Sequence, residues 1–110
     1  MSHMQHHAII VTSYSFEHIN TAVEKAREVF GAVFIPAPSQ TNAYWSFFIP
    51  PDGSYEGWEE SDDGDHNREK YRAWLKEHLQ FDWAEVQYGS EYGDDKLVDS
   101  SRKNYTSAPY

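Results

Sequence analysis

Cysteine is absent from this chain of 110 residues. Its absence excludes disulfide bridges, zinc–thiolate sites, thiolate-held iron–sulfur clusters and cysteine nucleophiles. Small secreted domains often depend on disulfides, so a chain without them is expected in the cytoplasm. The nucleophile elbow G-x-S-x-G, the phosphate-binding loop, the dinucleotide fingerprint and the zinc motif H-E-x-x-H are also missing. We therefore expect a protein that is not an enzyme, with no catalytic residues, no metal and no cofactor.

Long hydrophobic runs and basic residues are also scarce. The longest apolar runs are far shorter than a membrane span, and no signal peptide precedes them. Asp and Glu number 18 against 9 Lys and Arg, which gives a formal net charge of −9. Because phosphate backbones and anionic lipids repel such a chain, we expect no direct binding to nucleic acid or to membranes. The electrostatic partners that remain are basic proteins and cations, unless the charge serves solubility alone.

Length and composition fit one folded domain. Aromatic residues make up 16 % of the chain, whereas disordered chains are poor in them. Residues 1–3 resemble a cloning remnant ahead of Met4. The expected α+β domain covers residues 4–99, and residues 100–110 are expected to form a polar tail.

The first two elements are predicted from local patterns. The β-branched run at residues 6–12 predicts a buried strand. Ser15 suits a helix N-cap, Glu17 suits the positive end of the helix dipole, and Gly31 suits a C-terminal cap. Apolar residues between these caps recur at helical spacing and predict one buried helix face. They are Ile19, Ala22, Val23, Ala26, Val29 and Phe30.

The remaining elements are predicted in the same way. Strands are expected at 32–35, 44–49, 83–88 and 96–98, the first of them ending at prolines that cannot donate ladder hydrogen bonds. A second helix is expected to begin near Asp65, a good N-cap residue. Its predicted buried stripe contains Tyr71, Trp74, Leu75, His78 and Leu79.

The order of these elements is β-α-β-β-α-β with an extra C-terminal strand. It matches the split-βαβ, ferredoxin-like pattern, an antiparallel sheet with two helices on one face. A looser α+β sandwich is the alternative. Neither fold implies a function, because such scaffolds carry many unrelated activities.

Residues 52–65 are dominated by acids and contain no Lys or Arg. Like charges this close repel one another, so the segment is expected to project into solvent. It would form a docking surface for a basic protein, with Tyr55 and Trp58 as aromatic anchors. The alternative is a solvated loop with Trp58 folded back onto the core. The expected partner-binding residues are Asp52, Tyr55, Glu56, Trp58, Glu59, Glu60, Asp62, Asp63 and Asp65.

A second set of acids lies toward the C-terminus. If both sets share a face, their carboxylates would line a surface at phosphate-like density and imitate a nucleic acid. The second set comprises Asp82, Glu85, Glu91, Asp94, Asp95 and Asp99.

Two further patterns in the sequence bear on ion binding. Placing Gly64 sixth in a calcium-binding loop puts Lys70 at the twelfth position, where a bidentate glutamate is needed, so no calcium site is expected. Arg68, Arg72 and Lys76 recur at four-residue spacing and form a basic stripe. This stripe is either a solvated helix face with ordinary ion pairs or an anion site.

Three stretches, at residues 6–12, 51–65 and 82–89, resemble small acidic proteins of bacteriophages and prophages. Such proteins often inhibit host enzymes, as anti-restriction and anti-CRISPR proteins do, and some imitate DNA. The resemblance implies inhibition of a host protein by binding, inside the bacterial cell, and does not identify the target. Together with the acidic surface it favours a host protein that handles nucleic acid. It implies no role for any individual residue.

Two other hypotheses stay open beside inhibition by binding. A small enzyme or ligand-binding domain would use a sheet face lined by Tyr44, Trp45 and Phe47, with His6 or His7 nearby. A self-associating module would pair the aromatic strand 44–49 with its copy in a homodimer, if that strand lies at a sheet edge.

Overall fold

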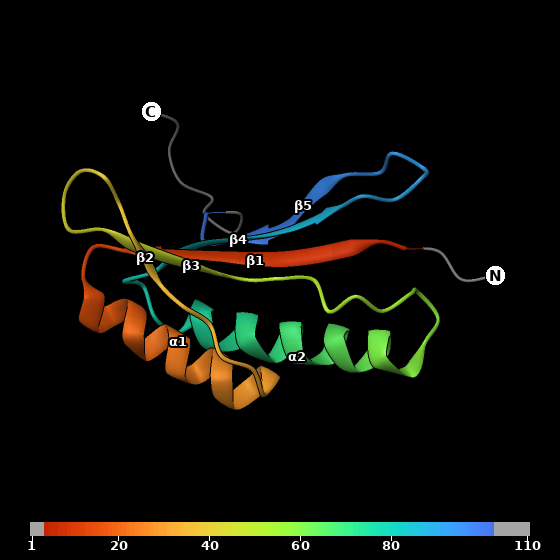
Figure 1. Cartoon of the computed structure of the whole chain (residues 1–110), viewed down its shortest axis with the longest axis horizontal. Helices are drawn as coiled ribbons and strands as arrows, with labels where there is room; N and C mark the ends of the chain where they lie inside the picture. The colour runs from red at the N-terminus through yellow and green to blue at the C-terminus, as the bar shows by residue number, and fades with distance from the viewer. Residues whose placement is uncertain (1–3, 103–110) are drawn as a thin grey trace.

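The computed structural model describes residues 4–102, which fold as one antiparallel sheet with two helices on one of its faces (Figure 1). The strand order across the sheet is β2-β3-β1-β4-β5. The predicted α+β class is confirmed, and the arrangement is compatible with a split-βαβ plan. The elements are β1 (His6–Ser13), α1 (Phe16–Phe30), β2 (Ala37–Pro38), β3 (Trp45–Ile49), α2 (Glu59–Lys76), β4 (Asp82–Tyr88) and β5 (Lys96–Ser100).

Strand β1 is central and pairs with β3 on one side and β4 on the other. Alternate side chains of a strand point to opposite faces, and here Ile9 and Val11 face the helices and are fully buried. Ile10 lies between them in the sequence and points to the opposite face, where it is 46 % exposed.

Helix α1 matches its sequence signals. Ser15 is the N-cap, and its hydroxyl accepts a hydrogen bond from the backbone N–H of His18. Gly31 ends the helix in the left-handed conformation, with φ of 69°, which glycine adopts without steric cost. The predicted stripe packs on the sheet, with Ile19, Ala22, Val23 and Ala26 buried and Val29 and Phe30 partly buried against the core.

The prediction of a strand at residues 32–35 is wrong. Only Ala37 and Pro38 pair with β3, opposite Ser46 and Trp45, and they form the edge strand β2. Proline is tolerated there because the outer side of an edge strand needs no ladder donor. The apolar run at 32–35 reflects burial of Phe34 against Phe47, while Ile35 is exposed.

Helix α2 begins six residues earlier than Asp65. Glu59, Glu60 and Asp62 lie in its first turn, where carboxylates interact favourably with the positive end of the helix dipole. The acids that predicted a loop therefore stabilise the start of a helix. Asp65 is not the N-cap, since the backbone of Trp58 occupies that position without a side-chain cap.

The core lies between the helices and the central strands. Tyr71 and Leu75 of α2 are buried in it, and the Tyr71 hydroxyl donates to the carbonyl of Ala22 at 2.7 Å. His78 is partly buried, stacks on Trp74, and bonds to the Trp74 carbonyl through Nδ1 at 2.7 Å. Leu79 was predicted to be buried but is 86 % exposed, because α2 ends at Lys76 and the helical spacing stops there.

The C-terminal hairpin completes the sheet. Strand β5 pairs with β4 as expected and continues to Ser100, with a register shift between Glu85 and Val86. Residues 1–3 and 103–110, which include the predicted cloning remnant and most of the predicted tail, lie outside the described residues. Neither helix within 4–102 has the length and apolarity needed to cross a membrane.

Candidate partner-binding site

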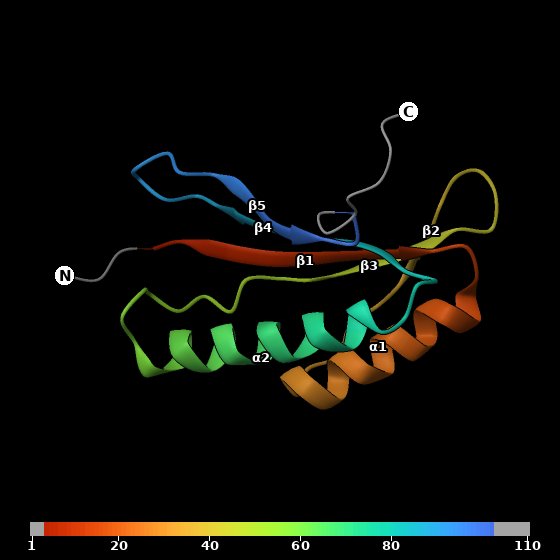
Figure 2. The same cartoon turned by 180° about the vertical axis from the view of Figure 1, so that it is seen from behind.

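Parts of the two acidic sets lie at one end of the molecule, whereas Asp82 of the second set begins β4 at the other end. Helix α2 starts at the same end at which the β4–β5 hairpin turns, and the two opposite views agree on this (Figures 1 and 2). The exposed acids of α2 and of the hairpin turn therefore share this end, which we call the acidic end. They are Glu59, Glu60, Asp62, Asp63, Glu91, Asp94 and Asp95.

Eight of the nine predicted binding residues are exposed, and only Glu56 is half-buried. Three of the predicted carboxylates also contact the protein itself. Glu56 accepts a hydrogen bond from the hydroxyl of buried Ser61 at 2.8 Å. Asp65 and Asp52 both pair with Arg68 while staying exposed, so part of their charge is neutralised within the chain.

The two predicted aromatic anchors lie against each other. The Tyr55 and Trp58 ring centroids are 5.0 Å apart, and the side chains are 40 % and 44 % exposed. Tyr55 also forms an isolated β-bridge with Met4, which ties this loop to the start of β1. Trp58 is therefore not folded into the core, and the pair presents apolar surface among the carboxylates.

A shallow cavity of about 350 Å³ lies beside the start of α2. Its apolar lining includes Phe34, Ile49 and Pro51, and its acidic lining residues are Asp52, Glu60 and Asp63. The largely buried Arg68 also lines it and pairs with Asp52, so Glu60 and Asp63 are the carboxylates left for a cation. An apolar floor with carboxylates around it suits the aliphatic stem and cationic head of a lysine or arginine side chain. Sequence patterns did not reveal this cavity, because its residues come from three separate segments.

Gly64 allows the loop before α2 to approach the helix closely. A Cβ atom at this position would lie 2.2 Å from Oδ2 of Asp52. That carboxylate accepts hydrogen bonds through Oδ1 from the backbone N–H of Ser54 at 2.9 Å and from its hydroxyl at 2.6 Å. Gly64 thus has a packing role inside a helix, and the residues that would form a calcium loop are helical.

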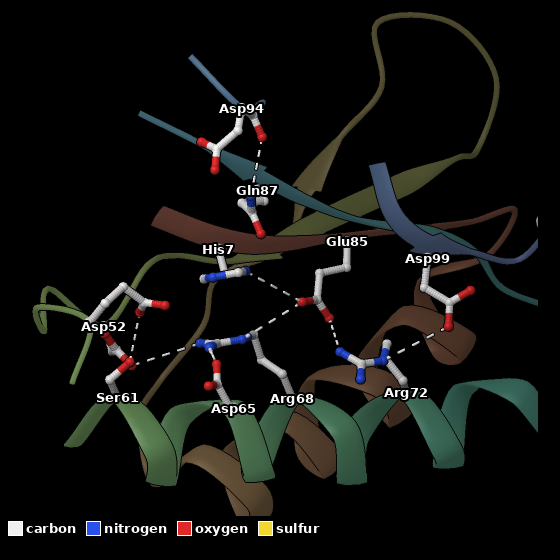
Figure 3. A network of polar contacts seen from close by, with 11 residues as sticks. His7, Asp52, Ser61, Asp65, Arg68, Arg72, Glu85, Gln87, Asp94 and Asp99 are labelled. Carbon is white, nitrogen blue, oxygen red and sulfur yellow. Dashed lines mark hydrogen bonds and ion pairs between the residues drawn. The ribbon is translucent and has the colours of Figure 1, made fainter. Parts of the chain in front are cut away.

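Beneath the acidic end, a network of buried charges joins α2 to the sheet (Figure 3). Glu85 of β4 has a side chain only 2 % exposed, and Arg72 donates a short hydrogen bond to its Oε1. Its Oε2 lies 3.8 Å from Nε of Arg68 and 3.8 Å from Nδ1 of His7. Asp99 of β5 joins the network through Nε of Arg72 at 3.9 Å and also pairs with Lys76 at 2.9 Å.

This network decides the role of the basic stripe on α2. Arg68 has a side chain only 7 % exposed, and Arg72 only 21 %. Arg68 and Arg72 therefore form neither a solvated face nor an open anion site, because carboxylates of the same chain pair with them, whereas Lys76 stays exposed and pairs with Asp99. Glu85 and Asp99, both assigned to the second acidic surface, contribute to the interior instead.

The electrostatics of the network follow from burial and from these pairs. Burial lowers the pKa of His7 below its ordinary value, and the charge of Arg68 lowers it further against the opposing effect of Glu85. Burial alone would raise the pKa values of Asp52 and Asp99. Hydrogen bonds from Ser54 and the charge of Arg68 outweigh it at Asp52, so the pKa there is lowered. Lys76, the Ser100 backbone and Arg72 lower the pKa of Asp99 in the same way.

The alternative site on the aromatic strand is not assembled. Phe47 is buried in the core, and Trp45 packs on Phe16. Trp45 lies opposite Ser13 at the end of β1, whereas His6 and His7 begin that strand. Strand β3 lies between β1 and β2, and β2 pairs only with Trp45 and Ser46.

Comparisons with known proteins do not identify a family for this chain. No protein-family model, no curated protein and no solved structure matches the chain. Within residues 4–102, no group of three or more His, Asp or Glu side chains is arranged to hold a metal ion.

Proposed function

We propose that this protein is a non-enzymatic binding protein whose acidic end docks on a basic host protein that handles nucleic acid. The observation that carries the proposal is that acids of α2 and of the β4–β5 hairpin turn lie at one end, together with the exposed pair of Tyr55 and Trp58. Complementary charge speeds and orients such an encounter, and aromatic side chains supply contact energy.

The cavity beside α2 gives the docking a specific contact. A lysine or arginine of the partner would insert its stem against Phe34 and Pro51 while its charge meets Glu60 and Asp63. Docking there would place carboxylates where the partner otherwise holds phosphates. The partner would then be inhibited by competition with its nucleic acid, as expected for a phage-type DNA mimic.

The test compares two matched charge reversals. Glu60→Lys with Asp63→Lys changes the acidic end, and Glu60 lies in the first turn of α2. Glu17→Lys with Glu24→Lys makes the same change in net charge on α1, and Glu17 lies in the first turn of that helix. The control therefore also carries a comparable helix-dipole cost. Helix α1 begins at the opposite end of the molecule (Figure 1).

Each variant serves as bait in a bacterial lysate at low and moderate salt, and captured proteins are identified by mass. The proposal expects a basic partner that added DNA displaces, that salt weakens, and that only the acidic-end variant fails to capture. Equal loss with both variants would mean that net charge alone drives the binding. Capture that survives reversal of the acidic end would refute the proposal.

A further inference from the structure

The sheet face opposite the helices is apolar and carries little charge. Among residues 4–102, no helix lies on it. Ile10, Phe48 and Leu97 are 46 %, 55 % and 49 % exposed on it. Strand pairing assigns these outward residues: His6, Ala8, Ile10 and Thr12 of β1, Ser46 and Phe48 of β3, Asp82, Ala84, Val86 and Tyr88 of β4, and Leu97 and Ser100 of β5.

The charge on this outer face differs sharply from that of the whole chain. The chain carries 27 acidic and basic residues in total, but Asp82 is the only Asp, Glu, Lys or Arg among the outward strand residues, and Arg102 is the one further charged residue that lines this face, beside Ile10 and Thr12. Contiguous apolar surface of this kind marks an interaction site in a soluble protein. A basic partner that docks by charge would find almost no complementary group here.

We propose that the outer face binds a second copy of this chain in a symmetric dimer, sheet against sheet. A twofold interface uses the same patch on both copies, so it must be self-complementary. The outer face meets that requirement. Ile10, Phe48 and Leu97 supply apolar surface that two sheets stacked about 10 Å apart would bury. The dimer lies outside the acidic end and does not depend on its function.

The charge distribution also selects the orientation of the two copies. Asp82 marks one end of the outer face, opposite Thr12, and His6 and Tyr88 mark the other end. With strands antiparallel across the interface, Asp82 of each copy meets the ring N–H and phenol O–H donors of His6 and Tyr88 in the other. The acidic ends then lie at opposite poles. A parallel arrangement would bring both acidic hairpin turns together, where like charges repel.

The first test is the mass of the full chain in solution, by light scattering or sedimentation, from ~1 µM to ~1 mM, which spans weak protein affinities. We expect twice the 12.8 kDa of one chain at the upper end. Phe48→Glu should return the protein to a monomer. Ile35→Glu, at an exposed apolar residue outside the sheet, should leave the dimer unchanged. Circular dichroism of both variants checks the fold, and Leu97→Lys on the edge strand provides a second disruption.

Orientation can be tested with added cysteines, because the natural chain has none. Asp82→Cys and His6→Cys chains mixed together should form a mixed disulfide on mild oxidation, and each alone should cross-link far less. Cross-linking of Asp82→Cys chiefly with itself would contradict the antiparallel arrangement.

Other outcomes would overturn the dimer itself. A monomer at every concentration would refute it, as would a dimer that folded Phe48→Glu and Leu97→Lys leave intact. A full chain that is monomeric while the chain ending at residue 102 dimerises would show that residues 103–110 occupy the face instead.

Discussion

The space between helices and sheet is filled in two different ways. Under α1, and where Tyr71 and Leu75 of α2 face the core, the contact is apolar, with Ile9, Ile19 and Leu75 buried in one cluster. Along another side of α2 the same sheet face presents Glu85 to Arg68 and Arg72. Ile9 and Glu85 are direct neighbours across β1 and β4, so the change occurs within one residue pair.

The apolar contact and the ion network respond differently to substitution. Apolar packing is non-directional, and a lost methyl group costs its transfer energy and a small cavity. A buried ion network needs every partner, since removal of one leaves an uncompensated charge. The ion network between α2 and β4 is therefore more sensitive to single substitutions than the apolar contact.

The largest expected effect is at Glu85. Glu85→Ala leaves Arg68 and Arg72 without their shared carboxylate and should lower the free energy of unfolding by about 3–5 kcal/mol. Ile9→Val at the neighbouring position should cost only about 0.5–1.5 kcal/mol. Urea unfolding measures both. Replacing Glu85 by Met and both arginines by Leu should recover most of the loss. Equal losses of unfolding free energy in Glu85→Ala and Ile9→Val would show that the ion network and the apolar contact do not differ in sensitivity.

A smaller effect is expected where the loop meets α2. Gly64→Ala normally stabilises a helix interior by about 1 kcal/mol, but here the new methyl group displaces the Asp52 carboxylate. The gain should be cancelled in the natural chain and should appear in an Asp52→Ala background. Thermal unfolding of the four chains measures this coupling. A full gain in the natural chain would mean that the Asp52 contacts contribute nothing.

The smallest expected effect is the pH response of His7. Its folded-state pKa lies below the ordinary 6.5, so the unfolded chain binds a proton that the folded chain does not. Stability should therefore fall as pH drops below 6.5, and His7→Gln should remove that slope. The lowered pKa values of Asp52 and Asp99 produce a separate loss only below their ordinary 3.8, as pH falls through the folded values. Urea midpoints measured across pH would separate the two steps, and an unchanged slope in His7→Gln would exclude His7 as the cause of the first.

The acidic segment is mostly helical, although its clustered charges favoured a loop. Clustered carboxylates predicted a projecting loop, yet the same charges stabilise the first turn of α2 and keep most of their exposure. The expected exposure of Glu59 and Asp63 is confirmed, while the loop is not. That the acids at the start of α2 and those of the β4–β5 hairpin turn lie at one end could not be predicted, because it depends on the lengths and directions of α2 and that hairpin.

Local chemistry alone determined α1, β1 and the approximate places of β3, β4 and β5, since caps and hydrophobic periodicity act over a few residues. Only the tertiary structure decided which face of β4 is buried. A period of two shows that Trp83, Glu85 and Gln87 share a face, but it does not say which face is inside. Here Trp83 packs into the core and carries Glu85 inward with it. Burial of that charge is possible because Arg68 and Arg72 meet it from α2.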